Sequence, residues 1–263
     1  MNLKFILLLL LFIGSISVLP AQKIKEIEPA ILECQYKLIV KHSSVKNGKQ
    51  AEDLMILRIG RKSSQFFSYY SYYADSLWND PIGNKLAMQL TMEAARTKDF
   101  SKVPAIRTRG GYLYKSFPEP ERLATYTASG SQKSGVYSVY YIEEEEDQAW
   151  KIKDSTKVIL GYPCKLASTE FRGRKYDAWF TSEIPLNNGP WKFSGLPGLI
   201  LEVYDDQDEF HYTLVGIRKD NLSPVSFYNF WENEFERTER KTFLKKEAER
   251  KKEKWDIMEL DWK

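Results

Sequence analysis

Residues that commonly carry catalysis are scarce in this chain, which has only two histidines and two cysteines among its 263 residues. It contains no H-E-x-x-H, no paired cysteines at zinc-binding spacing, no G-x-S-x-G and no glycine loop that would cradle a phosphate. Its histidines, His42 and His211, stand in strand-like sequence beside aromatic or aliphatic neighbours. These absences predict a protein that is not an enzyme and that uses no metal or cofactor. A hydrolase is the alternative, but the sequence offers it no nucleophile or metal ligands.

An excess of either charge is also lacking. Lysine and arginine number 39, aspartate and glutamate number 36, and the formal net charge is +3. Such a balance does not indicate a nucleic-acid partner. The acidic run at residues 143–147 is predicted to be a solvated strand end, since neighbouring carboxylates in a strand point to opposite faces and suit a cation poorly.

Long apolar runs are limited to the N-terminus, where Lys4 precedes the apolar residues 5–13. That run is shorter than the roughly 20 residues that span a bilayer, and a small residue, Ala21, precedes Gln22. We therefore predict a secretory signal peptide over residues 1–21 and an exported, periplasmic or secreted protein that does not span the membrane. An uncleaved membrane anchor is the alternative. The mature residues 22–263 are expected to form a single domain.

The rest of the chain is rich in strand patterns. Strands are predicted around residues 32–41, 54–60, 65–70, 136–142, 150–152, 158–171, 175–181, 199–203 and 210–217. Helices are predicted at residues 76–98 and, as a charged C-terminal helix, at 234–254. The fold class is therefore α+β: a mainly antiparallel, strongly curved β-sheet or half-open barrel with a mid-chain helix and a C-terminal charged helix.

The two cysteines are Cys34 and Cys164. In an oxidising export compartment a lone pair of cysteines is more often bonded than free, so a disulfide is predicted. Two separate buried thiols are the alternative, because free cysteine is among the most buried residue types.

The stretch W-K-F-S-G-L-P-G-L-I-L-E-V, residues 191–203, is dense in turn-forming and apolar residues. Gly195 can adopt backbone angles closed to other residues, and Pro197 with Gly198 favours the centre of a type II turn. The segment is thus a rigid corner that leads into a strand. It either seals the core or, with Leu196 and Leu199, lines a groove for a ligand or a partner chain. Around it lie aromatic residues that are core or a ligand platform: Tyr162, Tyr176, Trp179, Trp191 and Phe193.

The hexapeptide at residues 195–200, G-L-P-G-L-I, resembles the motif that names the GLPGLI family of exported proteins from Bacteroidetes-type bacteria. The resemblance extends over residues 159–167, 171–174, 178–185 and 189–193, in the expected order. It implies an exported envelope protein. It implies no activity, because the family has no agreed biochemical function.

Two hypotheses about function follow. The first is a non-enzymatic accessory or adaptor protein of the envelope that binds another envelope protein, such as an outer-membrane receptor or transporter component, through residues 191–203. The alternative is a carrier that holds an apolar or peptide ligand in a concave sheet. The predicted binding residues are the same for both: Trp179, Trp191, Phe193, Gly195, Leu196, Pro197, Gly198 and Leu199.

Overall fold

The computed structural model describes residues 24–41, 50–99, 103, 111–129, 137–232 and 234–250. The predicted signal peptide, His42 and the end of the predicted C-terminal helix lie outside these residues. The elements, in chain order, are β1 (Ile24–Glu28), β2 (Leu32–Val40), β3 (Ala51–Ile59), β4 (Ser64–Ser68), α1 (Tyr69–Trp78), α2 (Pro81–Thr97), β5 (Tyr112–Lys115), β6 (Arg122–Ser129), β7 (Tyr137–Glu144), β8 (Lys151–Ile159), β9 (Tyr162–Phe171), β10 (Arg174–Thr181), β11 (Leu199–Asp205), β12 (Phe210–Arg218), β13 (Val225–Tyr228), β14 (Glu236–Arg237) and α3 (Arg240–Arg250).

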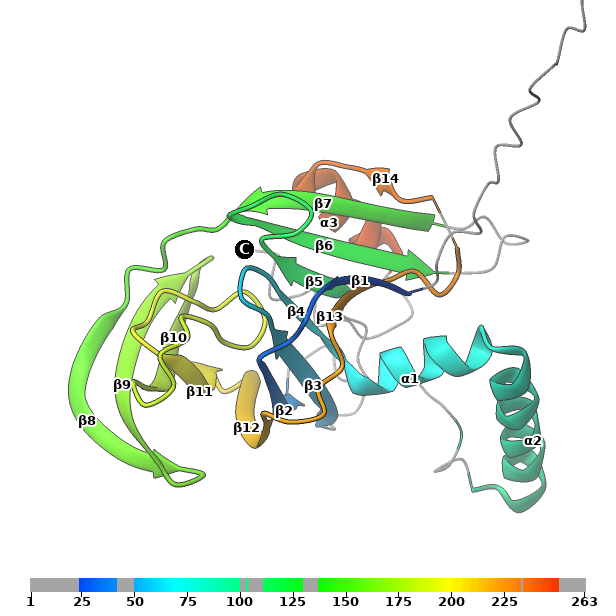
Figure 1. The fold of residues 1–263 in the computed structure, drawn as a ribbon, viewed down its shortest axis with the longest axis horizontal. Coiled ribbons are helices and arrows are strands. Elements are labelled where there is room, and N and C mark those ends of the chain that lie inside the picture. The colour runs from blue at the N-terminus through cyan, green and yellow to red at the C-terminus, as the bar shows by residue number, and fades with distance from the viewer. Residues whose placement is uncertain are drawn as a thin grey trace, which may run out of the picture.

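Within the described residues, one large sheet dominates the fold. Its twelve strands run in the order β14-β7-β6-β5-β4-β3-β2-β12-β11-β10-β9-β8, and β1 pairs with β13 in a separate two-stranded sheet. All neighbours in the large sheet are antiparallel except β14 and β7. Figure 1 shows the sheet twisting from β6 and β7 through β2 to the strongly bent β8 and β9. The prediction of a mainly antiparallel sheet with helices is confirmed.

Two tight hairpins organise the last strands of this sheet. Arg172 and Gly173 both have positive φ, 50° and 74°, as a two-residue type I′ turn requires between β9 and β10. The same geometry at Leu160 and Gly161 joins β8 to β9. The hairpin at Gly173 was predicted correctly, but the single strand predicted over residues 158–171 is wrong, because the Leu160–Gly161 turn divides it.

The predicted mid-chain helix is in fact two helices. Ser68 begins α1, since its hydroxyl accepts the Ser71 amide at 3.1 Å, so the strand predicted over residues 65–70 ends two residues early. Asp80 caps α2 in the same way, accepting the Gly83 amide at 2.6 Å. Helix α1 packs on β3 and β4, whereas α2 packs on α1 and projects away from the sheet (Figure 1).

The C-terminal helix is shorter at its start than predicted. Residues 236–237 form β14, beside β7, and α3 begins only at Arg240. The helix is charged but buries Phe243 completely, against Val139 and Tyr141 of β7. This contact holds α3 against β7.

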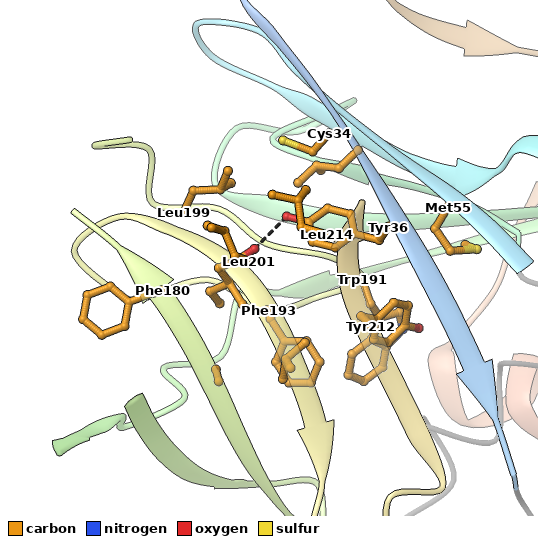
Figure 2. Packing of buried hydrophobic residues seen from close by; sticks show 14 of the residues in the cluster. Cys34, Tyr36, Met55, Phe180, Trp191, Phe193, Leu199, Leu201, Tyr212 and Leu214 are labelled. Atoms are coloured by element: carbon orange, nitrogen blue, oxygen red, sulfur yellow. Dashed lines mark hydrogen bonds between the residues drawn. The ribbon is translucent and has the colours of Figure 1, made fainter. Parts of the chain in front are cut away.

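The main core joins strands from distant parts of the sheet. It includes side chains from β2, β3, β4 and β5 and also from β9, β10, β11 and β12. Figure 2 shows part of this core, where labelled side chains of β2, β3, β10, β11 and β12 converge. Tyr36 of β2 donates its hydroxyl to the carbonyl of Ile200 of β11 at 2.7 Å. Since strands so far apart in the sheet share one core, the sheet curls around it.

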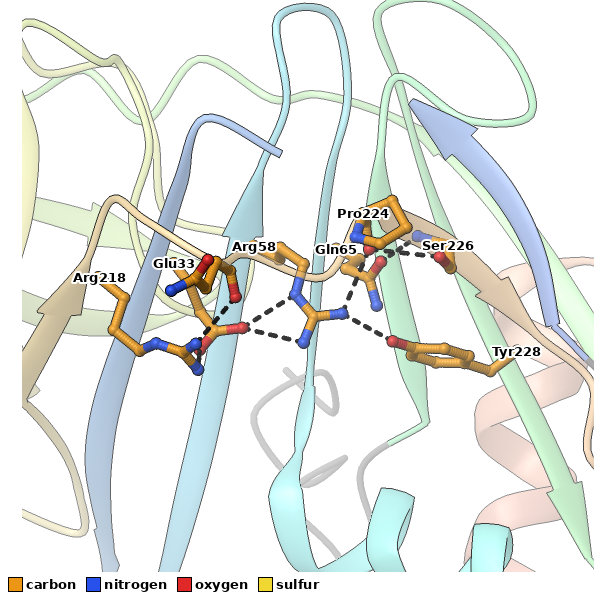
Figure 3. A network of polar contacts seen from close by, with 8 residues as sticks. Glu33, Arg58, Gln65, Arg218, Pro224, Ser226 and Tyr228 are labelled. Atoms are coloured by element: carbon orange, nitrogen blue, oxygen red, sulfur yellow. Dashed lines mark hydrogen bonds and ion pairs between the residues drawn. The ribbon is translucent and has the colours of Figure 1, made fainter. Parts of the chain in front are cut away.

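A buried polar network fixes β13 to the other face of the sheet. The Arg58 guanidinium donates to Glu33 at 3.0 Å and to the Tyr228 hydroxyl at 2.7 Å, and Arg218 donates to the second oxygen of Glu33 (Figure 3). The Gln65 side chain accepts the amide of Ser226. Every charge in this network therefore has a partner, which a buried ion pair requires.

Candidate functional site

The turn at residues 195–198 is tighter than the sequence suggests. The Gly198 amide donates to the Leu196 carbonyl at 2.8 Å, which closes a three-residue turn centred on Pro197. The Leu199 amide donates to the Ile184 carbonyl at 3.0 Å and not to Leu196. Since the φ of Gly198, +147°, is also far from the roughly +80° of a type II turn, the predicted type II turn is not formed. The φ angles of Gly195 and Gly198 are +89° and +147°, and a Cβ on Gly198 would overlap the backbone of Thr181. The prediction that Gly195 adopts backbone angles closed to other residues is confirmed, and Gly198 does so as well.

The apolar side chains of residues 191–201 point into the core. Trp191 is 6% exposed, Phe193 1%, Leu196 2% and Leu199 0%. Phe193 lies 4.9 Å from the Tyr176 ring and 5.2 Å from the Trp191 ring, in edge-to-face contacts. The exposed part is a two-residue tip, Gly195 and Pro197. The segment is thus a buried corner whose own side chains fill the inside of the curved sheet.

Trp179 has a different environment from the other predicted binding residues. It is half-buried in β10 at the margin of the core, and the Lys157 ammonium lies 4.4 Å from the centre of its ring. The structure therefore brings Trp191, Phe193, Leu196 and Leu199 together in one cluster and leaves Trp179 beside it.

An ionic contact that the sequence did not reveal holds this corner in place. Lys192 is 1% exposed, and its ammonium pairs with Glu143 at 2.6 Å and bonds the Tyr141 hydroxyl at 3.0 Å. Arg172 and Arg240 pair with the other Glu143 oxygen, at 2.8 and 3.3 Å. The prediction of a solvated acidic run is therefore wrong for Glu143, although residues 144–147 are exposed. The available signal in the sequence was Lys192 itself, because a lysine between Trp191 and Phe193 needs a charged partner if the segment is buried.

A second buried lysine, Lys115 of β5, was also missed. Its ammonium donates to the side-chain oxygen of Asn188 at 2.9 Å and to the carbonyls of Phe193 and Gly189 at 2.7 and 3.3 Å. Burial lowers the pKa of Lys115 to about 8. These bonds pin the chain that leads into the tip to the middle of the sheet.

The corner in turn positions the start of β8. Gln148 donates to the Lys192 carbonyl at 2.8 Å and accepts the Ser194 amide at 3.3 Å. The Trp150 indole donates to the Ser194 carbonyl at 2.7 Å, and Gly195 lies against this indole. The exposed tip and the residues that lead into β8 therefore lie side by side on the buried corner.

Strand β8 is an edge of the sheet. Within the described residues it pairs only with β9, and most of its residues are exposed. A cleft of about 480 Å³ lies at its start, lined among others by Lys151, Lys153, Lys175, Thr169 and Asp177. The β8–β9 register shifts between Ile152 and Thr156, beside this cleft.

A chain of charged groups runs from Lys41, just after β2, across β12 and β11 to Lys157 of β8. The two ring nitrogens of His211 bond Asp208 at 2.9 Å and Glu202 at 2.8 Å, while Lys41 pairs with Asp208 and Lys157 with Glu202. The bond to Glu202 outweighs burial and raises the pKa of His211. Burial would raise the pKa of Glu202, but the bonds from His211 and Lys157 prevail and lower it.

The predicted disulfide is not formed. Cys34 and Cys164 are both free, buried thiols, and three strands (β12, β11 and β10) separate β2 from β9 in the sheet. Because a disulfide links Cα atoms no more than about 7 Å apart and each strand step adds about 4.8 Å, the sheet order keeps the two apart. Burial also raises the pKa of Cys34 to about 12, so it is not an activated nucleophile.

The described residues hold neither a cluster of metal ligands nor a helix that could span a membrane. They contain no group of three or more His, Cys, Asp or Glu side chains arranged to hold a metal ion. None of their helices is both long and apolar enough to cross a lipid bilayer.

The fold and the site together define the class of protein. It is a protein built on an open antiparallel sheet that curls around a buried corner formed by its own chain. The family model described as "Protein of unknown function (Porph_ging)" matches residues 169–202, from the end of β9 to the middle of β11. No curated protein matches the chain. Structures of PNGF-II in space groups C2 and P21 resemble it over 81% of its length, with TM-scores of 0.51 and 0.50 and identities of 13% and 14%. The chain spans 31% and 32% of those proteins, and the likeness concerns the fold alone.

Proposed function

We propose that this chain is a non-enzymatic adaptor of the cell envelope, a GLPGLI-family protein exported by its signal peptide. It binds another envelope protein, such as an outer-membrane receptor or transporter component, through the tip of residues 195–197 and the adjoining start of β8. One observation carries the proposal. The corner that bears the tip is fixed by buried side chains and buried ion pairs, so its small exposed part is presented in one conformation.

Rigidity of this kind suits recognition, because a surface that is already ordered loses little conformational entropy when it binds. The proposal places contact at the exposed residues Gly195 and Pro197, with Trp150 beside them. The buried predicted residues Trp191, Phe193, Leu196 and Leu199 serve as the scaffold under that contact. The half-open barrel is part of the same proposal, supported by the core that β2–β5 share with β9–β12.

The carrier alternative has less support. It needs an accessible apolar cavity of at least about 300 Å³, whereas Trp191, Phe193 and Leu196 occupy the inside of the curved sheet. The cleft beside β8 is large enough and most of its lining surface is apolar, but it lies at the edge of the sheet, with charged residues around it.

The adaptor can be tested with a photo-crosslinking amino acid placed at Pro197 in cells that make the protein. The matched control is Ile82 of α2, which is 79% exposed and belongs to the projecting helix pair. We expect a discrete crosslink to an outer-membrane receptor or transporter component from position 197 and none from position 82. Identical patterns from both positions would contradict the proposal. A stoichiometric small-molecule adduct in native mass spectra would favour the carrier.

A further inference from the structure

We propose that β8 is a docking edge for an extended, acidic segment of the partner protein, which adds a strand to the sheet. This inference rests on the proposed adaptor function and names the chemistry of the segment that is bound. Three features of the molecule support it: the shape of the two sheet edges, the charges of β8 and the cleft at its start.

The two edges of the large sheet differ strongly. In the part of the chain that the structure describes, one edge is β14, with two residues, beside a strand on which α3 packs. The other is β8, with nine residues, paired on one side only. A long edge strand offers a row of backbone donors and acceptors to an incoming strand, and such edges are commonly shortened or covered. Here one edge is short and the other is left long.

The charges of β8 select an acidic partner. The strand carries Lys151, Lys153 and Lys157 against a single acidic residue, Asp154. Lys153 pairs with Asp177 and Lys157 with Glu202 inside the sheet, so a docked carboxylate would meet Lys151 and compete for the other two. Edge lysines normally prevent pairing between copies of one protein, because like charges face each other. Antiparallel self-pairing about Ser155, for example, would place Lys153 opposite Lys157. The same lysines favour a strand that bears carboxylates.

The cleft and the exposed apolar side chains of β8 give such a strand further contacts. Lys151 and Lys153 of β8 and Lys175 of β10 line the cleft of about 480 Å³, together with Glu170, Asp177 and Asp206. Lys153 pairs with Asp177 at 3.4 Å, so an acidic side chain in the cleft would meet Lys151 and Lys175 and compete with Asp177 for Lys153. Ile152 and Val158 are 52% and 69% exposed, so apolar residues of the incoming strand can cover them. The bonds of Trp150 and Gln148 to the corner hold this end of β8 in place before binding.

The test uses a capped peptide of nine residues, the length of β8, in which glutamate and valine alternate. The first control peptide has lysine in place of each glutamate. The second keeps the acidic sequence but has alternate backbone nitrogens methylated, which blocks strand pairing and preserves the charge. Binding is measured by fluorescence anisotropy, and its position by amide hydrogen exchange. We expect the acidic peptide alone to bind and to slow exchange in β8.

The protein variant is Lys151→Glu with Lys153→Glu, and the matched control is Lys85→Glu with Lys219→Glu, two exposed lysines elsewhere. Because exposed ion pairs are each worth only a fraction of a kcal/mol but reversal adds repulsion, we expect the first pair to weaken binding about tenfold and the second to have little effect. Equal binding of acidic and basic peptides, binding of the methylated peptide, or no slowing of exchange in β8 would overturn the inference.

Failure of this inference can be separated from failure of the adaptor function. If the crosslink from position 197 persists in the Lys151→Glu, Lys153→Glu protein at unchanged yield, the adaptor stands and the β8 edge is not its docking strand. If the crosslink is lost in that variant but kept in the Lys85→Glu, Lys219→Glu protein, both proposals are supported.

Discussion

Single residues decide the shape of the corner, and Gly198 shows how strictly. Its φ of +147° belongs to a region that side chains rarely adopt, and its missing Cβ leaves room for the backbone of Thr181. Gly161, in the β8–β9 hairpin, also has a positive φ, +84°, but a Cβ there would meet nothing within 4 Å. A side chain at position 161 would therefore introduce backbone strain alone, whereas a side chain at position 198 would introduce both strain and steric overlap.

The Gly198→Ala substitution should therefore cost far more stability than Gly161→Ala. We expect a loss of about 3 kcal/mol or more at Gly198, where strain and backbone overlap add, and about 1 kcal/mol at Gly161, where only the left-handed conformation is penalised. Urea unfolding of the three proteins, followed by tryptophan fluorescence, measures the difference. Equal losses at the two glycines would show that the corner can move away from Thr181.

At the scale of elements, the sequence predicted those strands and turns that depend on a local residue pattern. The alternating residues of β2 and the Gly173 turn were recognised because strand periodicity and turn chemistry act over a few residues. The sequence did not predict β5 and β6. Nor did it predict the break between α1 and α2, which depends on the single N-cap that Asp80 provides to α2. The partners of Lys192 and Lys115 were missed because Glu143 and Asn188 are distant in sequence and meet only through the tertiary fold.

Elements are also joined electrostatically, and this gives stability a dependence on pH. The pKa of His211 is raised from its usual 6.5 by Glu202, so its contribution to stability is complete below about pH 6.5 and is lost as pH rises through the folded value. The pKa of Glu202 is lowered from 4.5, so its contribution is present above about pH 4.5 and is lost as pH falls through the folded value. The contacts between β11, β12 and Lys157 of β8 are thus strongest from about pH 4.5 to 6.5.

The Glu202→Gln substitution tests this coupling directly. In the wild-type protein, NMR titration should give His211 a pKa above 6.5, and Glu202→Gln should lower it because an amide cannot stabilise the imidazolium as a carboxylate does. Asp177→Asn is a matched control, since this aspartate lies in β10 and bonds Ser168 and Lys153. A His211 pKa at or below 6.5 in the wild type would contradict the arrangement.

At the scale of the whole molecule, one core serves both halves of the described sheet. Cys34 from β2 and Cys164 from β9 both belong to it, although three strands lie between theirs. Sequence reasoning favoured a disulfide because it could weigh the compartment but not the strand order. The curled sheet buries both thiols by packing, and each is at most 1% exposed. We therefore expect the reactivity of both thiols to depend on global unfolding.

Thiol titration tests whether global unfolding governs the reactivity of the two cysteines. The protein is purified without reductant for this measurement. In native buffer we expect almost no reaction with a maleimide, because the thiols are buried and the pKa of Cys34 is raised to about 12. In denaturant both cysteines should react, since neither is bonded to the other. A protein that gains no maleimide in denaturant unless it is first reduced would contain the disulfide, and the order of β9 to β12 and β2 would then have to be different. Reaction at the rate of global unfolding, measured across denaturant concentrations, would show that the two halves of the sheet open together around their common core.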